Sequence, residues 1–303
     1  MKKISGSICA LATPFCGDAL DLGAFAALIE YQIAAGTQAL VVAGSTGEAH
    51  ALDQAEFDRL LEFAVARVDG RVPVVAGTGT ANTRKTISAT RRAQTLGADA
   101  ALVVTPYYVR PTQQGLFRHF SEVADHAGLP IVLYNVPSRT GCDMLPETTA
   151  RLATHEAIVG IKEAVGEPAR VAALVALKND GFCVLSGDDP SCAAAILAGA
   201  QGIVSVAANV APAAMRALCD AALGGDATVT LQRDAGLQGL YHLLGTEPNP
   251  IPLKWCLHRL GIGTAELRLP LLSLSPRYHA QAQQVLDELH LHVAVQPRHS
   301  SAA

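Results

Sequence analysis

Residues 130–141 read Pro-Ile-Val-Leu-Tyr-Asn-Val-Pro-Ser-Arg-Thr-Gly, an apolar run that passes directly into a polar loop. Seven other short runs rich in Val, Ile and Ala occur along the chain, and each has the length and composition of a buried strand. The eight predicted strands are residues 7–12, 39–43, 72–76, 100–104, 130–134, 158–161, 182–185 and 202–206. The chain therefore contains a regular series of buried strands.

The segments between these strands have helical spacing. Phe25, Leu28 and Ile29, for example, follow one another at the intervals that form the apolar face of a helix. Strand starts lie roughly 20 to 35 residues apart, which fits one strand and one helix per interval, and no linker or composition break divides them. One domain is predicted. Eight units favour a closed barrel, although the spacing alone also fits an open doubly wound sheet.

The positions of the polar clusters favour the barrel. Such clusters follow five of the strands, at residues 44–48, 77–79, 105–108, 135–141 and 186–189. In a barrel these loops all lie on one face, which carries the active site. We therefore predict an α/β fold, a (β/α)8 TIM barrel over residues 1–211, followed by a C-terminal helical part over residues 212–295 that packs on it as one structural unit. Residues 296–303 are predicted to fray.

Composition limits the classes of partner. Half of the 303 residues are hydrophobic, the formal net charge is −4, and Lys and Arg are scattered, so no nucleic-acid partner is predicted. No apolar run reaches the roughly 20 residues of a spanning helix, and we expect a soluble cytoplasmic protein without a membrane partner. The seven cysteines form no C-x-x-C pair and the histidines lack metal-ligand spacing, which predicts free thiols and no metal. Asp188 and Asp189 are interpreted as a turn and helix cap.

Lys162 is the most informative single residue, because it lies in Val-Gly-Ile-Lys-Glu-Ala at 159–164, a stretch otherwise suited to a buried strand. Burial disfavours a charged ammonium and favours a neutral amine, which attacks carbonyl carbons to form a Schiff base. The alternatives are a structural ion pair with Glu163 or Glu48, or an edge strand whose lysine is solvated. Lys254, by contrast, falls at an expected helix start.

Two tyrosines and one arginine follow strands on the same predicted face. Tyr134 ends the strand before that of Lys162, and its phenol can carry protons at the carbinolamine and enamine stages of Schiff-base chemistry. Tyr108 raises the same possibility, and for both residues the alternative is core packing with the hydroxyl at the rim. The planar fork of Arg139 suits a substrate carboxylate, unless the side chain is simply solvated.

The loop from Gly44 to Gly47 is a candidate carboxylate site, because glycines let the main-chain N–H groups approach a ligand. The alternative is a helix N-cap formed by Ser45 or Thr46. No Lys follows Gly47, so the loop is not a Walker motif.

Six motifs of the chain resemble those of the dihydrodipicolinate synthases, within the N-acetylneuraminate lyase superfamily of class I pyruvate aldolases. They are Gly-Ser-Thr-Gly-Glu at 44–48, Thr-Pro-Tyr-Tyr at 105–108, Tyr-Asn-Val-Pro-Ser-Arg-Thr-Gly at 134–141, Gly-Ile-Lys-Glu-Ala at 160–164, Ser-Gly-Asp-Asp at 186–189 and Asn-Pro-Ile-Pro-Leu-Lys-Trp at 249–255. The motifs occur in the family's order between about residues 5 and 272, and the string at 134–141 is highly specific.

The resemblance implies a homotetramer, a dimer of tight dimers, that condenses pyruvate with L-aspartate 4-semialdehyde to 4-hydroxy-tetrahydrodipicolinate in lysine and diaminopimelate biosynthesis. Lys162 would form an imine with pyruvate, and the protonated imine would serve as the electron sink, so that no metal or organic cofactor is needed. Arg139 would receive the carboxylate of the semialdehyde.

The same resemblance assigns the remaining site residues. The proton relay would consist of Tyr134, Thr46 or Ser45, and Tyr108 from a neighbouring subunit. The carboxylate of pyruvate would be held by the amides of Ser45 and Thr46, with Val204 near its methyl group and Gly187 also at the substrate.

One departure from the family pattern bears on the aldehyde substrate. Ser45 stands where the synthases more often carry Thr, and Gly-Ser-Thr-Gly-Glu is common among sugar-acid lyases of the superfamily. A related class I aldolase or dehydratase acting on a sugar acid or another 2-keto acid adduct would keep Lys162 and Tyr134, and Arg139 discriminates between the two hypotheses. A third hypothesis is a barrel that only binds or scaffolds.

A second departure concerns regulation. Lysine-inhibited members of the family place His, Asn and Glu side chains at a subunit-interface site, and the matching positions here are Gln54, Phe57, Ala81 and Lys85. A cationic Lys85 opposes binding of another cation. We therefore predict weak or absent feedback by lysine.

Overall fold

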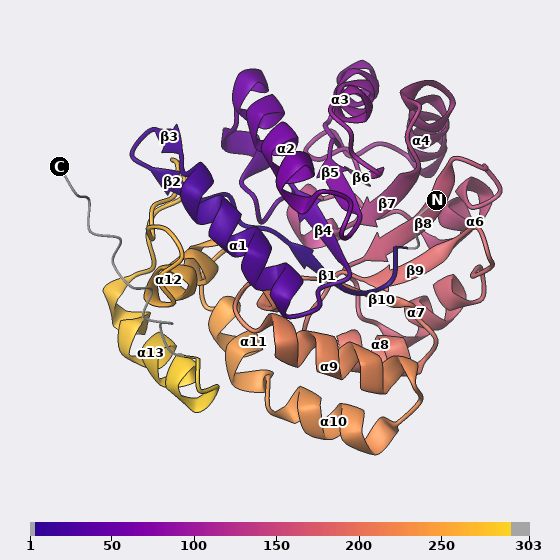
Figure 1. Ribbon diagram of the computed structural model, residues 1–303. Coiled ribbons are helices and arrows are strands. Elements are labelled where there is room, and N and C mark those ends of the chain that lie inside the picture. The colour runs from indigo at the N-terminus through magenta and orange to yellow at the C-terminus, as the bar shows by residue number, and fades with distance from the viewer. Residues whose placement is uncertain (1–3, 292–303) are drawn as a thin grey trace.

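The computed structural model describes residues 4–291, which form a closed barrel of eight parallel strands surrounded by helices (Figure 1). Around the barrel the strand order is β1, β10, β9, β8, β7, β6, β5 and β4, and β4 pairs with β1 to close it. The strands are β1 Gly6–Ala10, β4 Ala39–Val42, β5 Val74–Gly77, β6 Ala100–Val104, β7 Ile131–Asn135, β8 Ile158–Glu163, β9 Cys183–Ser186 and β10 Gly202–Ser205. Each predicted strand overlaps one of these, and the prediction of a (β/α)8 barrel is confirmed.

Helices cover the outside of the barrel between successive strands. Several begin at a capping side chain: a carboxylate oxygen of Asp53 accepts the N–H of Glu56, and the hydroxyl of Thr112 accepts that of Gly115. The helices are α1 Leu22–Ala34, α2 Gln54–Val68, α3 Thr83–Thr95, α4 Gln113–Ala127, α5 Pro137–Thr140, α6 Pro146–Leu152, α7 Pro168–Val175, α8 Cys192–Leu197 and α9 Pro212–Leu223. These two caps fix where the loops before α2 and α4 end.

The C-terminal part is helical, as predicted, with α10 Ala227–Ala235, α11 Gln238–Leu244, α12 Ile251–Arg259 and α13 His279–Glu288. The boundary placed at residue 211 lies at the start of α9, which packs against β1 and α8. None of the helices within residues 4–291 is both long and apolar enough to cross a membrane. The tail predicted to fray, 296–303, lies outside the described residues.

One hairpin was not predicted. It consists of β2 Phe15–Cys16 and β3 Ala19–Leu20, and it lies between β1 and α1. The hydroxyl of Thr264 donates to the carbonyl of Phe15 at 2.8 Å, so the hairpin contacts the segment that follows α12. In Figure 1 the hairpin and α12 lie on the same side of the barrel. This hydrogen bond connects the C-terminal part to the hairpin near the start of the chain.

Alternation along the strands creates two apolar layers. Val41, Leu102 and Leu185 belong to the cluster inside the barrel, whereas Leu133 and Ile161 belong to the larger cluster between strands and helices. All of β8 is buried. Because Ile161 faces the helices, the next residue along β8 faces the inside of the barrel.

The seven cysteines are free thiols, and five of them are buried. Burial raises the pKa of Cys219 and of Cys256 to about 12. A thiol with so high a pKa is almost entirely protonated at neutral pH and is a poor nucleophile. The five buried cysteines therefore act as small apolar side chains, as predicted, whereas Cys16 is exposed.

Candidate active site

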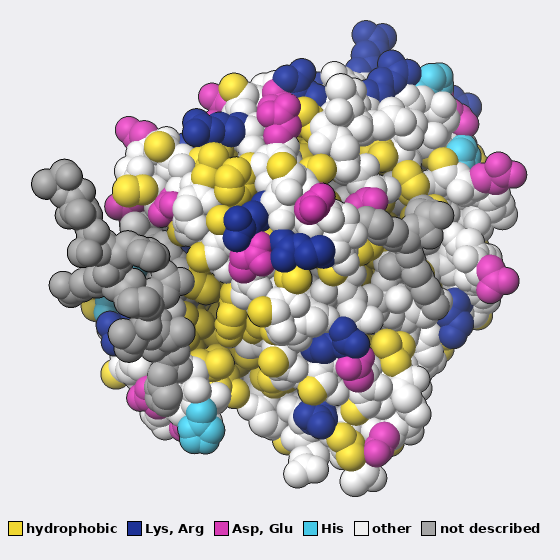
Figure 2. Space-filling view, viewed as in Figure 1, with side chains coloured by type: hydrophobic (Ala, Val, Ile, Leu, Met, Phe, Trp, Pro, Cys, Tyr) yellow, Lys and Arg dark blue, Asp and Glu magenta, His cyan; other side chains and the backbone are white. Residues whose placement is uncertain are grey.

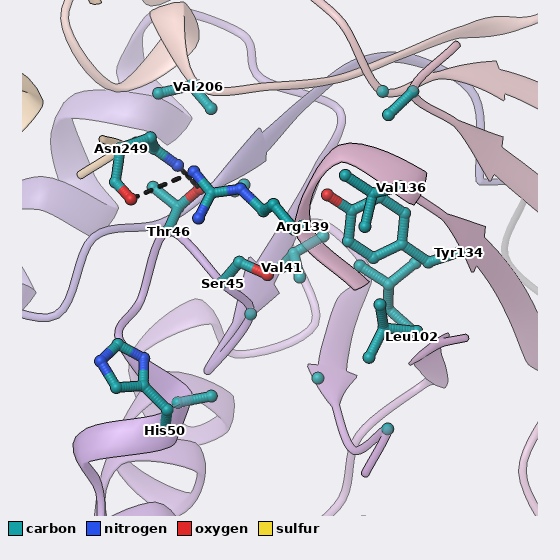
Figure 3. A pocket seen from close by; sticks show the side chains of 18 of the residues that line it. Val41, Ser45, Thr46, His50, Leu102, Tyr134, Val136, Arg139, Val206 and Asn249 are labelled. Carbon is teal, nitrogen blue, oxygen red and sulfur yellow. Dashed lines mark hydrogen bonds between the residues drawn. The ribbon is translucent and has the colours of Figure 1, made fainter. Parts of the chain in front are cut away.

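A cavity of about 770 Å³ opens at the carboxyl ends of the barrel strands. Its wall combines the loops that follow β4, β5, β7, β8 and β9 with the segment that precedes α12. Figure 3 shows side chains from several of these loops converging on one space. Six predicted site residues line the cavity: Ser45, Thr46, Tyr134, Arg139, Lys162 and Gly187.

Lys162 faces the inside of the barrel and is only 5% exposed. It pairs in register with Tyr134, and its Nζ lies 4.2 Å from the centroid of the Tyr134 ring. No carboxylate within residues 4–291 forms a salt bridge with it, because Glu48 pairs with Lys254 and Glu163 pairs with Arg170. The structure therefore contradicts both alternatives, the structural ion pair and the solvated edge strand. It leaves an amine in a buried cavity without a salt-bridge partner among the described residues.

Three residues with hydroxyl groups line the same cavity as Lys162. Tyr134 is 7% exposed, and Figure 3 shows its hydroxyl pointing into the space that Ser45 and Thr46 border. Ser45 and Thr46 belong to the loop after β4, and Thr46 is buried. Three hydroxyl groups in one cavity with an amine supply both donors and acceptors for proton transfer.

Asn249 was not assigned a role from the sequence, yet it connects two of the predicted residues. Its Nδ2 donates to the Thr46 hydroxyl at 3.0 Å, and its backbone carbonyl accepts from the Arg139 guanidinium at 3.2 Å. Thr46 Oγ1 thus accepts one hydrogen bond while its own hydrogen remains available to a different acceptor. The only sequence signal for Asn249 is its position at the start of the motif 249–255.

Arg139 is exposed at the rim of the cavity, in α5. Within residues 4–291 it forms no salt bridge, and its side chain donates one hydrogen bond, to the backbone carbonyl of Asn249, which uses one of its five N–H groups. The remaining donors can bind an anion that enters the cavity.

Gly187 and Val204 differ in their relation to the cavity. A β-carbon built on Gly187 would lie 2.9 Å from both Cγ and Cε of Lys162, so only glycine leaves room for the lysine side chain. Val204 belongs to the apolar cluster inside the barrel, and among the described residues it is Val206 that lines the cavity. A substrate in the cavity can therefore contact Val206, whereas Val204 lies in the apolar layer inside the barrel.

Tyr108 lies outside the cavity formed by its own chain. Its side chain is 90% exposed, its φ is +72°, and its amide N–H donates to the carbonyl of Thr140 at 3.1 Å. Tyr107, the preceding residue, lines the cavity instead. A large aromatic side chain held in a rare backbone conformation and directed to solvent suggests a contact outside the single chain.

The two consecutive aspartates have structural roles. Asp188 accepts the N–H of Ser191 at 3.1 Å in the turn before α8, so the predicted turn is confirmed, but no side chain caps α8 and the predicted helix cap is wrong. Asp189 accepts hydrogen bonds from Ser205 Oγ at 2.5 Å and from the N–H of Ala207 at 2.9 Å, and burial raises its pKa. Within residues 4–291 no group of three or more His, Cys, Asp or Glu side chains is placed to hold a metal ion.

Comparisons with known proteins agree with this geometry. The model of the dihydrodipicolinate synthetase family matches residues 3–289. A 4-hydroxy-tetrahydrodipicolinate synthase of Xanthomonas axonopodis pv. citri (strain 306) is 59% identical over 284 residues, 93% of this chain and 94% of that protein. Dihydrodipicolinate synthase of Aquifex aeolicus superposes with a TM-score of 0.94 at 40% identity, covering 96% and 100% of the two chains. A chloride-inhibited dihydrodipicolinate synthase from Acinetobacter baumannii, complexed with pyruvate, gives a TM-score of 0.93 at 40% identity, covering 95% and 100%.

Proposed function

The chain belongs to the dihydrodipicolinate synthetase family, and on that premise we propose that it is a Schiff-base-forming lyase that condenses pyruvate with L-aspartate 4-semialdehyde to 4-hydroxy-tetrahydrodipicolinate. The observation that carries the proposal is the placement of Lys162. A buried amine that pairs with no carboxylate of residues 4–291 lies 4.2 Å from the centroid of the Tyr134 ring, in a cavity that Ser45, Thr46 and Arg139 also line.

The first half of the reaction uses the Lys162 amine. Its nitrogen adds to the keto carbon of pyruvate, and the carbinolamine loses water to give an imine. The protonated imine withdraws electrons, so a proton leaves the methyl group and an enamine forms. The enamine carbon then attacks the aldehyde carbon of the semialdehyde, whose oxygen takes up a proton and remains as the hydroxyl group of the product.

The second half releases the enzyme. The amino group of the bound semialdehyde attacks the imine carbon, the six-membered ring closes, and Lys162 departs as a free amine. One water molecule is lost in the whole sequence, at the carbinolamine stage. The electron sink is the imine itself, so the proposal includes no metal or organic cofactor.

The hydroxyl groups supply the proton transfers in this proposal. Tyr134 exchanges protons with the carbinolamine oxygen and the enamine carbon, with Thr46 and Ser45 as its relay partners. The hydrogen bond from Asn249 supports this role, because it leaves the Thr46 hydrogen free to donate. The backbone amides of Ser45 and Thr46 hold the carboxylate of pyruvate, beside Gly187, and Val204 lies behind the methyl group.

Tyr108 completes the relay from a neighbouring subunit in a homotetramer, a dimer of tight dimers, in the cytoplasm. Its exposure of 90% and its position outside the cavity of its own chain support a role in a second copy.

Arg139 is proposed to bind the carboxylate of the semialdehyde, which makes it the residue that tests the choice of aldehyde. Arg139→Ala should lower kcat/KM for aspartate semialdehyde by about 10²-fold or more, because charge-assisted hydrogen bonds contribute about 1.5–3 kcal/mol each. The pyruvate adduct at Lys162 should still form. The measurement is steady-state kinetics with a panel of aldehydes.

Arg118→Ala provides the control, since Arg118 is an exposed residue of α4 away from the cavity. It should leave every kinetic constant unchanged. Two results would contradict the choice of aspartate semialdehyde: equal rates with this and other aldehydes, or an unchanged kcat/KM in Arg139→Ala. Either result would favour a related aldolase or sugar-acid lyase.

Feedback by lysine is proposed to be weak or absent. The outer part of the cavity is lined by His50, Gln54 and Phe57, while Asp53 is engaged as the cap of α2 and Lys85 is exposed on α3. The initial rate at millimolar lysine should change by less than about twofold, since even a fivefold effect needs about 1 kcal/mol of coupling. A lysine titration that shows half-inhibition at sub-millimolar concentration contradicts this prediction.

A further inference from the structure

A buried ion pair joins the loop after β4 to the C-terminal part of the chain. Glu48 is fully buried and Lys254, in α12, is 2% exposed; Nζ of the lysine lies 2.7 Å from Oε1 of the glutamate. The second carboxylate oxygen of Glu48 accepts the N–H of Arg268 at 3.1 Å. One carboxylate therefore holds two segments that lie more than two hundred residues further along the chain.

The surroundings of the pair exclude water. Phe15 covers it, with its ring centroid 4.2 Å from Nζ of Lys254 and 4.3 Å from the guanidinium carbon of Arg268. Arg268 is itself paired with Glu56 at 2.5 Å. Burial lowers the pKa of Lys254, and the charge of Glu48 opposes that shift. Each side chain of the pair stabilises the charged form of the other, because an unpaired charge buried at this depth is unfavourable.

The backbone at Glu48 also needs an anchor. Its φ is +51° and its ψ is +40°, a left-handed conformation that is strained for a residue with a β-carbon. Its N–H donates to the carbonyl of Ser45 at 3.2 Å, and the carbonyl of Gly47 accepts from the Thr13 hydroxyl at 2.7 Å. The turn that carries Ser45 and Thr46 thus ends at a strained residue whose side chain is fixed from α12.

A second link runs from the same segment. Asn249 lies just before α12 and donates to Thr46, so the start of α12 contacts the loop both through Asn249 and, within its first turn, through Lys254. The geometry points to Glu48 as a positioning residue, which acts through Lys254 to hold the amides of Ser45 and Thr46 where the carboxylate of pyruvate binds. This inference rests on the proposed function. It makes α12 a determinant of pyruvate affinity, although neither Glu48 nor Lys254 lines the cavity.

Glu48→Gln, Lys254→Met and the double variant test this role. Glu48→Gln should raise KM for pyruvate about tenfold or more, while kcat and KM for the aldehyde stay within about threefold, because only the binding of one carboxylate is disturbed. The single variants should also lose thermal stability, since each leaves one partner buried alone. The double variant buries no unpaired charge, so its Tm should recover towards the wild-type value while KM for pyruvate stays raised.

The readouts are Tm, the two KM values and the fraction of Lys162 trapped by borohydride as a function of pyruvate concentration. Asp220→Asn is the control, because it removes the carboxylate of an ion pair in α9, away from the cavity, and should leave KM for pyruvate unchanged. If Glu48→Gln fails to fold, the double variant alone decides.

The positioning role is wrong if the double variant has the wild-type KM for pyruvate. It is also wrong if the variants lower only Tm or only kcat and leave KM for pyruvate unchanged. Either result leaves the proposed function intact. Absence of any pyruvate adduct at Lys162 in the wild-type protein overturns the proposed function and this inference with it.

Discussion

Lys162→Met should abolish the borohydride-stable adduct with pyruvate and lower kcat/KM by about 10⁴-fold or more, which corresponds to about 5.5 kcal/mol of lost transition-state stabilisation. Methionine keeps most of the length and apolar character of the lysine stem beside Tyr134 but has no nitrogen to attack a keto group. The protein should remain folded, because the substitution removes a buried polar group that has no salt-bridge partner within residues 4–291.

The adduct must be located by peptide mapping after reduction, since the chain contains a second buried lysine. Lys254 is engaged by Glu48 at 2.7 Å and lies outside the cavity, so it should carry no added mass. Lys178→Met is the control, because Lys178 is exposed, its Nζ donates to the carbonyl of Gly199, and it does not line the cavity. An adduct on Lys254, or one that persists in Lys162→Met, would refute the assignment of the nucleophile.

Tyr134→Phe should lower kcat by about 10²- to 10⁴-fold, the usual contribution of a positioned acid or base, while KM for pyruvate changes little. Phenylalanine retains the ring that packs against Lys162, and no hydrogen-bond partner of the Tyr134 hydroxyl within residues 4–291 is left unpaired by its removal. The imine should therefore still form, but slowly, and loss of the methyl proton should become slow as well.

Exchange of the methyl protons of pyruvate with deuterated water, followed by NMR, reports the enamine step without the aldehyde. This exchange should slow in Tyr134→Phe in parallel with kcat. Tyr31→Phe is the control: its hydroxyl donates to the carbonyl of Val210 at 2.9 Å, so it should lose about 1 kcal/mol of stability and keep full activity. Wild-type exchange in Tyr134→Phe would exclude Tyr134 from proton transfer.

Local sequence patterns were sufficient to predict the barrel and several of the residues that line the cavity. Strand positions depend on short runs of Val, Ile and Ala, which the chain carries at regular intervals. Eight such runs also fit an open sheet, and it was the polar clusters after five of them that favoured the closed barrel, which the structure confirms. Because the carboxyl ends of all eight strands share one face, polar residues just beyond them must converge. That argument placed Ser45, Thr46, Arg139 and Gly187 in the cavity.

The residues that sequence analysis missed are those whose partners lie far away in the chain. Asn249 contacts Thr46 across 203 positions, and Lys254 pairs with Glu48 across 206. A lysine at a helix start usually lies in water. Nothing local indicates that Lys254 is buried, since its burial depends on Phe15 and on a glutamate held in a left-handed conformation.

The sequence by itself indicated the barrel, the face of the barrel that carries the cavity and a lysine within a buried strand, because each depends on periodicity or on a polar residue within an apolar strand. Only the tertiary structure decided which charges are paired. Lys162 and Lys254 are both buried lysines, and they differ because Glu48 reaches one of them and no carboxylate of residues 4–291 reaches the other. Charge pairing is set by distances in space of a few ångströms, which separation along the chain does not specify.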